Sequence, residues 1–190
     1  MNPLVVVGDA LLDQDVTGRV DRVAADAPVP VVDGATTRTR PGGAALAAYL
    51  ASLEGRDVVL VTGLGKDNAS AAVRALLRGR VTIVELPLTG ALSKKTRVLA
   101  EGHPLLRLDE GDGRAGQATR EAADAVAGAA AILVSDYGRG TVDTLREELT
   151  RAAARRVPLV WDPHPRGGAP VPGTRLATPS AREAQGFAGG

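Results

Sequence analysis

Four cationic side chains lie close together in this 190-residue sequence: Lys94, Lys95, Arg97 and Arg107. The stretch predicts two short strands joined by a turn at 102–104, and alternate residues of a strand share a face, so Lys95 and Arg97 point the same way. Two cations on one face could clamp a phosphate group, because an arginine holds it through two parallel hydrogen bonds. The alternative is a charged edge strand that discourages aggregation.

The predicted elements end repeatedly at carboxylates, namely Asp13, Asp136, Asp162 and Glu183. Scattered acidic residues are more often solvated or cap helices. Here they recur along what would be one edge of a parallel sheet, where such folds bind ligands. This position favours recognition of hydroxyl groups and binding of a divalent cation, since carboxylate oxygens do both.

A glycine pair, Gly42 and Gly43, follows a basic segment and precedes a run with strong helix propensity. Backbone N–H groups at such a helix start are not covered by side chains, and the helix dipole favours an oxygen-rich or anionic ligand there. A turn that merely precedes a helix is the alternative.

Spacing excludes two other phosphate motifs and favours a surface or loop role over metal ligation for the histidines. The loop 63–67 would need a glycine at Leu60 and a hydroxyl at Asp67 to be a Walker A loop, and the first strand lacks the glycines of a dinucleotide fingerprint. His103 and His164 are the two histidines, and neither has a partner at metal-ligand spacing.

The elements that must position these side chains alternate between strands and helices. This order predicts a mostly parallel α/β sheet whose exit loops share one edge. Two segments, about 14–39 and 93–110, depart from the alternation and predict a small β lid over that edge. The predicted strands are 4–7, 57–62, 81–85, 131–135, 158–161 and 176–177. The predicted helices are 42–54, 68–78, 117–127 and a last one that Thr141 can cap and that ends near Arg156.

Composition limits the classes of function. A net charge of +1 gives no electrostatic reason to expect nucleic-acid or membrane binding, and the apolar run 4–7 is too short for a signal peptide or a membrane span. The absence of cysteine excludes disulfides and thiolate metal sites and favours a cytoplasmic protein.

Taken as a set, these motifs resemble the ribokinase/PfkB family of sugar kinases, and within it the D-glycero-β-D-manno-heptose-7-phosphate kinase branch. The resemblance runs from Leu4 to about Glu183. The motifs that carry it, in the order in which that family has them, are 7–13, 26–32, 40–45, 95–99, 106–109, 135–137, 162–163 and 178–179 followed by Glu183.

The resemblance implies a ribokinase-like fold and transfer of the γ-phosphoryl group of ATP to the anomeric hydroxyl of a sugar phosphate, assisted by Mg²⁺. On the substrate side it implies that Asp13 binds the sugar hydroxyls and that the backbone of Gly42 and Gly43 approaches the sugar closely. It also implies that three cations bind the phosphate of the substrate, namely Lys95, Arg97 and Arg107. It assigns Glu183 to the magnesium shell. On the nucleotide side it implies Asp136, Arg139, Asp162, His164 and Ser180.

The chain departs from the family pattern at several positions. Leu46 stands where the family usually has an asparagine, Arg139 and His164 replace lysines, and Ser180 replaces an asparagine. The sequence also ends before the Gly-Ala-Gly-Asp motif that carries the catalytic base. Loss of a general base typically costs about 10²–10⁴-fold in rate, so we expect a partial domain, 1–190, with no catalytic residue and little turnover on its own.

Two alternatives to a kinase portion stay open. One is a non-catalytic sugar-phosphate binder or pseudokinase, favoured by the altered polar contacts at Leu46, His164 and Ser180. The other is an interaction module that forms a homodimer through exposed strand edges of the lid.

Overall fold

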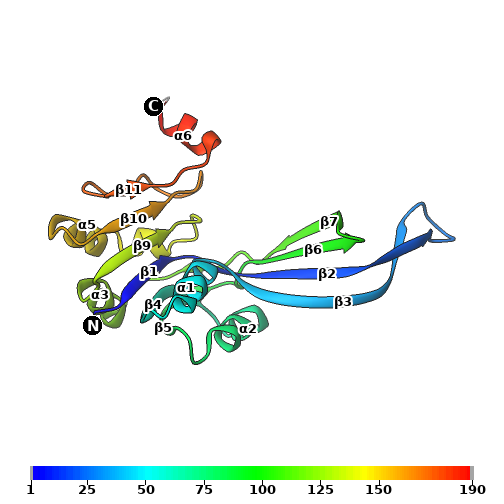
Figure 1. Ribbon diagram of the computed structural model, residues 1–190, viewed down its shortest axis with the longest axis horizontal. Helices are drawn as coiled ribbons and strands as arrows, with labels where there is room; N and C mark the ends of the chain where they lie inside the picture. The colour runs from blue at the N-terminus through cyan, green and yellow to red at the C-terminus, as the bar shows by residue number, and fades with distance from the viewer. Residues whose placement is uncertain (1, 189–190) are drawn as a thin grey trace.

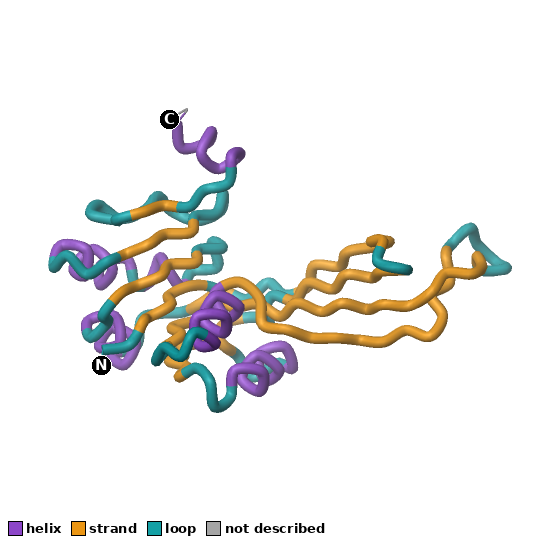
Figure 2. The backbone as a smooth tube through the Cα atoms, in the orientation of Figure 1, coloured by secondary structure: helices purple, strands orange, loops and turns teal. Residues whose placement is uncertain are grey.

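The computed structural model describes residues 2–188 and contains two sheets (Figures 1 and 2). The larger sheet has seven strands in the order β11-β10-β9-β1-β4-β5-β8, all parallel except for β8, which pairs antiparallel with β5. Its strands are β1 (Leu4–Gly8), β4 (Val58–Leu64), β5 (Thr82–Thr89), β8 (Arg114–Ala115), β9 (Ala131–Ser135), β10 (Leu159–Asp162) and β11 (Leu176–Ala177). The α/β fold class predicted from the sequence is therefore confirmed.

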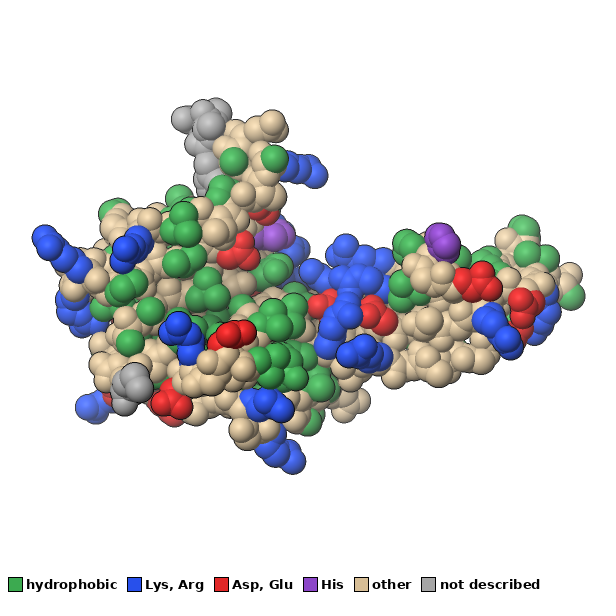
Figure 3. All heavy atoms as spheres, viewed as in Figure 1, with side chains coloured by type: hydrophobic (Ala, Val, Ile, Leu, Met, Phe, Trp, Pro, Cys, Tyr) green, Lys and Arg blue, Asp and Glu red, His purple; other side chains and the backbone are tan. Residues whose placement is uncertain are grey.

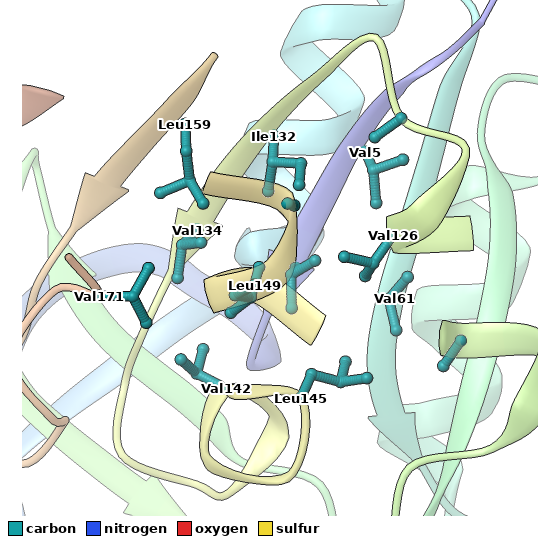
Figure 4. Packing of buried hydrophobic residues seen from close by; sticks show 14 of the residues in the cluster. Val5, Val61, Val126, Ile132, Val134, Val142, Leu145, Leu149, Leu159 and Val171 are labelled. Atoms are coloured by element: carbon teal, nitrogen blue, oxygen red, sulfur yellow. The ribbon is translucent and has the colours of Figure 1, made fainter. Parts of the chain in front are cut away.

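Helices cover both faces of this sheet, as the alternating order requires. They are α1 (Ala44–Leu53), α2 (Asn68–Leu77), α3 (Arg120–Ala127), α4 (Thr141–Thr144) and α5 (Arg146–Ala154), followed by α6 (Ala181–Ala188) near the C-terminus. Each strand of a sheet sends alternate side chains to opposite faces. Val6 accordingly packs with α1 and α2, whereas Val5 and Val7 pack with α3, α4 and α5. Figure 4 shows Val5 in this second core, near Val126.

The second sheet, called the lid below, projects from the body as a long arm (Figure 1). Its strand order is β3-β2-β6-β7, and it contains the segments 14–39 and 93–110. The strands are β2 (Ala10–Val23), β3 (Pro30–Gly43), β6 (Lys94–Ala100) and β7 (His103–Glu110). Asp9 alone separates β1 of the large sheet from β2 of the lid, and β3 of the lid runs directly into α1. The β2–β3 pair is therefore connected to the body at both of its ends.

Three predicted helix starts were wrong. The helix predicted from 117 begins at Arg120, because the Thr119 side chain caps it by accepting a hydrogen bond of 3.1 Å from Ala122 N. Gly42 and Gly43 end β3, and α1 begins at Ala44, because Gly42 pairs with Leu11 of the neighbouring strand. Thr141 does not cap the next helix: it is the first residue of α4, Gly140 takes the cap position, and the Thr141 hydroxyl is buried without a partner. The predicted helix from 141 is also interrupted at Leu145, whose backbone leaves helical geometry while its side chain is fully buried.

Candidate functional site

A cleft of about 190 Å³ lies where the lid joins the carboxyl edge of the large sheet. Figure 3 shows Lys and Arg side chains gathered in this region, with acidic side chains between them. The lid side of the cleft is lined by Ala10, Leu11, Ser93, Lys94, Lys95, Arg107, Asp109 and Glu110. The side of the large sheet is lined by Asp9, Tyr137, Arg139, His164 and Arg166.

The predicted sugar-binding residue Asp13 lies in β2, in register with Lys95 of β6. Its carboxylate is largely buried, with 12 % of the side chain exposed, and Oδ1 accepts a hydrogen bond of 3.0 Å from Arg97 Nη1. Arg97 also lies 3.7 Å from Asp15, which pairs with Arg40 at 2.8 Å. Arg97 is therefore already held by carboxylates, and a sugar hydroxyl would have to share Asp13 with it.

The glycine pair lies against this carboxylate. A Cβ atom on Gly42 would stand 2.5 Å from Asp13 Oδ2, and one on Gly43, whose φ is +58°, would stand 2.5 Å from the backbone oxygen of Asp9. The same Asp9 oxygen accepts a hydrogen bond from Ala44 N at 3.1 Å, so the first helical N–H is satisfied within the protein. Gly42 thus lets Asp13 occupy its position, in addition to any close approach of a ligand.

Lys95 differs from the neighbouring cations of the lid. Lys94 pairs with Glu110 at 2.8 Å, and Arg107 donates two hydrogen bonds, of 2.7 and 2.6 Å, to Asp109. Within residues 2–188, Lys95 has no carboxylate within 4.0 Å, and its Nζ lies 5.4 Å from the ring centre of Tyr137. Burial, reinforced by the nearby Arg107 charge, lowers the pKa of the Lys95 ammonium group.

The predicted nucleotide-side residues divide between two environments. His164 lines the cleft, its ring centre is 5.4 Å from that of Tyr137, and burial lowers its pKa. Arg139 also lines the cleft. Asp136 is instead buried beneath two loops, and its carboxylate accepts hydrogen bonds from Gly138 N at 2.8 Å and Gly168 N at 3.2 Å. Burial raises the pKa of Asp136 even though these bonds oppose the shift.

Of the predicted site residues, Lys95, Arg107, Arg139 and His164 line the cleft, and the others do not: Asp13, Gly42, Gly43, Arg97, Asp136, Asp162, Ser180 and Glu183. Burial raises the pKa of Asp162, whose carboxylate lies 3.4 Å from the Thr178 hydroxyl. Ser180 and Glu183 form a capping box at the start of α6: Ser180 N donates to Glu183 Oε2 at 2.7 Å, and Glu183 N donates to Ser180 Oγ at 3.3 Å. Across residues 2–188 no group of three or more His, Asp or Glu side chains could hold a metal ion. The assignment of Glu183 to a magnesium shell stays a prediction, because Mg²⁺ can be held by one or two carboxylates together with substrate phosphates and waters.

Sequence reasoning did not select three residues that the structure brings to the cleft. Arg166 and Tyr137 enter it from loops that follow β10 and β9. Asp9 lies at the end of β1 and is 96 % buried. Asp9 and Tyr137 fall within the motifs 7–13 and 135–137 that carry the family resemblance, but no role was inferred for either side chain.

No helix within residues 2–188 combines the length and the apolar character needed to cross a membrane. No family model matches the sequence. The comparisons with individual proteins do find relatives, in sequence and in structure.

The chain is 61 % identical over 186 residues to the bifunctional protein HldE of Streptomyces coelicolor, covering 98 % of this chain and 39 % of that protein. It is 33 % identical over 193 residues to HldE of Azorhizobium caulinodans, covering 95 % of this chain and 40 % of that protein. The chain thus spans about two fifths of the length of these curated relatives.

Among solved structures, the Arabidopsis thaliana ribokinase complexed with ribose and ATP superposes with a TM-score of 0.66 at 19 % sequence identity. That match covers all of this chain and 64 % of the ribokinase chain, and it establishes a ribokinase-like fold. Together with the sequence relatives it supports the resemblance carried by the motifs: the chain has a ribokinase-like fold and is similar to HldE proteins over nearly its whole length.

Proposed function

We propose that this chain supplies the sugar-phosphate side of a heptose-phosphate kinase. The carbohydrate-kinase lineage follows from the relatives, and the observation that supports the finer assignment is Lys95. A cation without a carboxylate partner, partly removed from water in a cleft, is poised for an anionic ligand, because burial strengthens its attraction to a negative charge.

We propose a role for each side of the cleft and for Asp13, which lies outside the cleft lining but in register with Lys95. Lys95 would bind the phosphate group that the sugar already carries, with Arg139 and Arg166 adding positive charge from the sheet side. Asp13 would accept hydrogen bonds from sugar hydroxyls in exchange for part of its pairing with Arg97. Arg107 would contribute only by loosening its two bonds to Asp109.

The reaction in which such a site would take part moves the γ-phosphoryl group from ATP to the anomeric oxygen, leaving ADP and releasing the hydroxyl proton. Phosphoryl transfer depends mainly on positioning and charge stabilisation. The carboxylates that line the cleft are already bonded: Asp9 to backbone N–H groups, Asp109 to Arg107 and Glu110 to Lys94. We therefore propose that this chain binds and orients the sugar phosphate but supplies no general base. ATP and magnesium stay part of this proposal, as does the cytoplasmic setting.

The test is calorimetric titration of the chain with D-glycero-D-manno-heptose 7-phosphate and with the unphosphorylated heptose. We expect the phosphate ester to bind more tightly, and Lys95→Met to weaken its binding by about 10–100-fold, since a hydrogen bond to a charged group is worth about 1.5–3 kcal/mol. Lys66→Met, at an exposed lysine of the loop between β4 and α2, is the matched control. Equal affinity for the two sugars, or no effect of Lys95→Met, would refute the assignment.

A second role, homodimer formation through the lid, is favoured by one observation. The edge strand β7 exposes Leu105, Leu106 and Leu108 by 42, 52 and 45 %, and exposed apolar edges pair readily with other chains. We propose that two copies associate through this edge. Sedimentation should show a dimer that Leu106→Lys converts to a monomer, and a wild-type monomer at high concentration would exclude it. A dimer without sugar-phosphate binding would favour the interaction module over the kinase portion.

A further inference from the structure

Asp9 occupies a junction of the fold that the proposed sugar-phosphate contacts do not use. It is the one residue between β1 of the large sheet and β2 of the lid, and only 4 % of its surface is exposed. Its backbone N donates to Ser135 O at 3.2 Å, and its backbone oxygen accepts from Ala44 N, directly after the glycine pair. The start of the lid, the end of β9 and the start of α1 therefore meet at this residue.

The Asp9 carboxylate binds the loop that follows β9. Oδ2 accepts hydrogen bonds from Tyr137 N at 3.0 Å and Arg139 N at 2.9 Å, and Oδ1 accepts one from Thr141 N at 3.2 Å. Within the described residues, no Lys, Arg or His side chain forms an ion pair with it. Three peptide N–H groups from one loop thus provide the polar partners that a buried carboxylate requires.

This loop carries two of the side chains that line the cleft, Tyr137 and Arg139. The Tyr137 ring lies between two neighbours: Lys95 Nζ of the lid is 5.4 Å from its centre, and the His164 ring centre is 5.4 Å away on the sheet side. An ammonium group within about 6 Å of an aromatic ring is attracted to its face. Lys95 therefore lies beside a ring whose backbone Asp9 holds.

We propose that Asp9 is a positioning residue, whose carboxylate holds the 137–141 loop so that the Tyr137 ring presents Lys95 to an anionic group in the cleft. Asp9 itself touches no ligand in this account. The inference rests on the proposed function insofar as the anion is a sugar phosphate. Its structural step, from Asp9 through Tyr137 to Lys95, is measurable without any ligand.

The first experiment compares Asp9→Asn with the wild-type chain in the absence of ligand. An asparagine keeps the shape of the side chain, but its NH₂ group faces N–H donors and cannot accept from them. We expect amide hydrogen exchange at Tyr137, Arg139 or Thr141 to accelerate by at least about 10-fold, and the ring-current shifts of the Lys95 methylene protons to diminish. Asp67→Asn is the matched control, because Asp67 also accepts a backbone hydrogen bond, from Ser70 N, but at the start of α2. It should lower stability without moving the Lys95 signals.

The second experiment measures affinity for D-glycero-D-manno-heptose 7-phosphate in a double-mutant cycle of Asp9→Asn and Tyr137→Ala. Residues that act through one another give non-additive effects. We expect Asp9→Asn to weaken binding by about 10-fold in the wild-type background and by less than about 3-fold when Tyr137 is already alanine. Full additivity would mean that Asp9 acts on the ligand directly or elsewhere, and would overturn the proposal.

The outcomes separate the two claims. If the wild-type chain binds no heptose phosphate, the proposed function fails, while the Lys95 shifts still decide the role of Asp9. If Asp9→Asn leaves those shifts unchanged, the positioning role is wrong whatever the chain binds. Should Asp9→Asn not fold, Asp9→Ser, which retains a small hydroxyl acceptor, replaces it in both experiments.

Discussion

Substitution of Gly42 by alanine tests whether the Asp13 carboxylate is held where the structure has it. The added Cβ would lie 2.2 Å from Leu11 Cδ1 and 2.5 Å from Asp13 Oδ2, whereas ordinary contacts begin at 3.4 Å. The leucine must therefore retreat by about 1.2 Å and the carboxylate by about 0.9 Å, the differences between those distances. Gly42 does not have a positive φ, so the expected effect comes from contact and not from backbone strain.

Neither neighbour is free to move by that amount. Leu11 is 4 % exposed, and Asp13 is held by Arg97 at 3.0 Å. Overpacking of this kind costs about 1–3 kcal/mol. For a chain of this size each kcal/mol lowers Tm by about 2–4 °C, so Gly42→Ala should lower it by about 2–12 °C. Displacement of Asp13 should also weaken heptose-phosphate binding.

The assays are thermal unfolding by calorimetry and titration with the sugar phosphate. Gly116→Ala is the control, because its Cβ would meet its nearest neighbour, Pro87 O, at an ordinary 3.4 Å, and Gly116 also lacks a positive φ. We expect the control to leave Tm and affinity near the wild-type values. A Gly42→Ala chain that matches the control in both measurements would show that Asp13 and Leu11 adjust freely, and would refute this account of the glycine.

Three further substitutions test neighbouring parts of the site. Gly43→Ala should lower Tm more than Gly42→Ala, since its φ is +58° and its Cβ would strike the backbone oxygen of Asp9; an equal or smaller loss would contradict that reading. Arg97→Met should destabilise the chain by about 1 kcal/mol in chemical unfolding, because Asp13 loses its partner in a partly exposed pair, and unchanged stability would mean that the pair contributes nothing. For Asp136, burial raises the native pKa above the ordinary value of 3.8, so the native state binds more protons than the unfolded state. The free energy of unfolding therefore falls as pH rises from 3.8 through the native pKa. Asp136→Asn should flatten this pH dependence of the unfolding free energy, and parallel wild-type and variant profiles would refute it.

Much of the fold follows from local sequence. The apolar run Val5-Val6-Val7 predicts a strand buried on both faces, and the structure packs its alternate residues into two separate cores. The predicted strand 131–135 coincides with β9. Periodicity and turn residues decide such elements because they act within a few positions of one another. Boundaries were less well predicted, as at Thr141, since caps depend on which hydrogen bonds the neighbouring chain offers.

The sequence also indicated which residue types form the site, but it did not indicate which of these side chains pair with each other. Asp13 and Arg97 are 84 residues apart, and nothing local indicates that one neutralises the other. Asp9 contacts a loop 128 to 132 residues away, so its importance emerges only from the folded chain.

The sequence by itself determined most of the order of strands and helices, although not β8, α6 or the break between α4 and α5. It also determined the positions of the glycine pair and the basic segment, and the sugar-kinase resemblance. Only the tertiary structure decided which charges stay available in the cleft. Arg97 and Arg107 are held by carboxylates, whereas Lys95 lies beside an aromatic ring. The physical reason is that availability depends on distances between side chains brought together by sheet pairing and lid geometry, and these distances are not encoded in spacing along the chain.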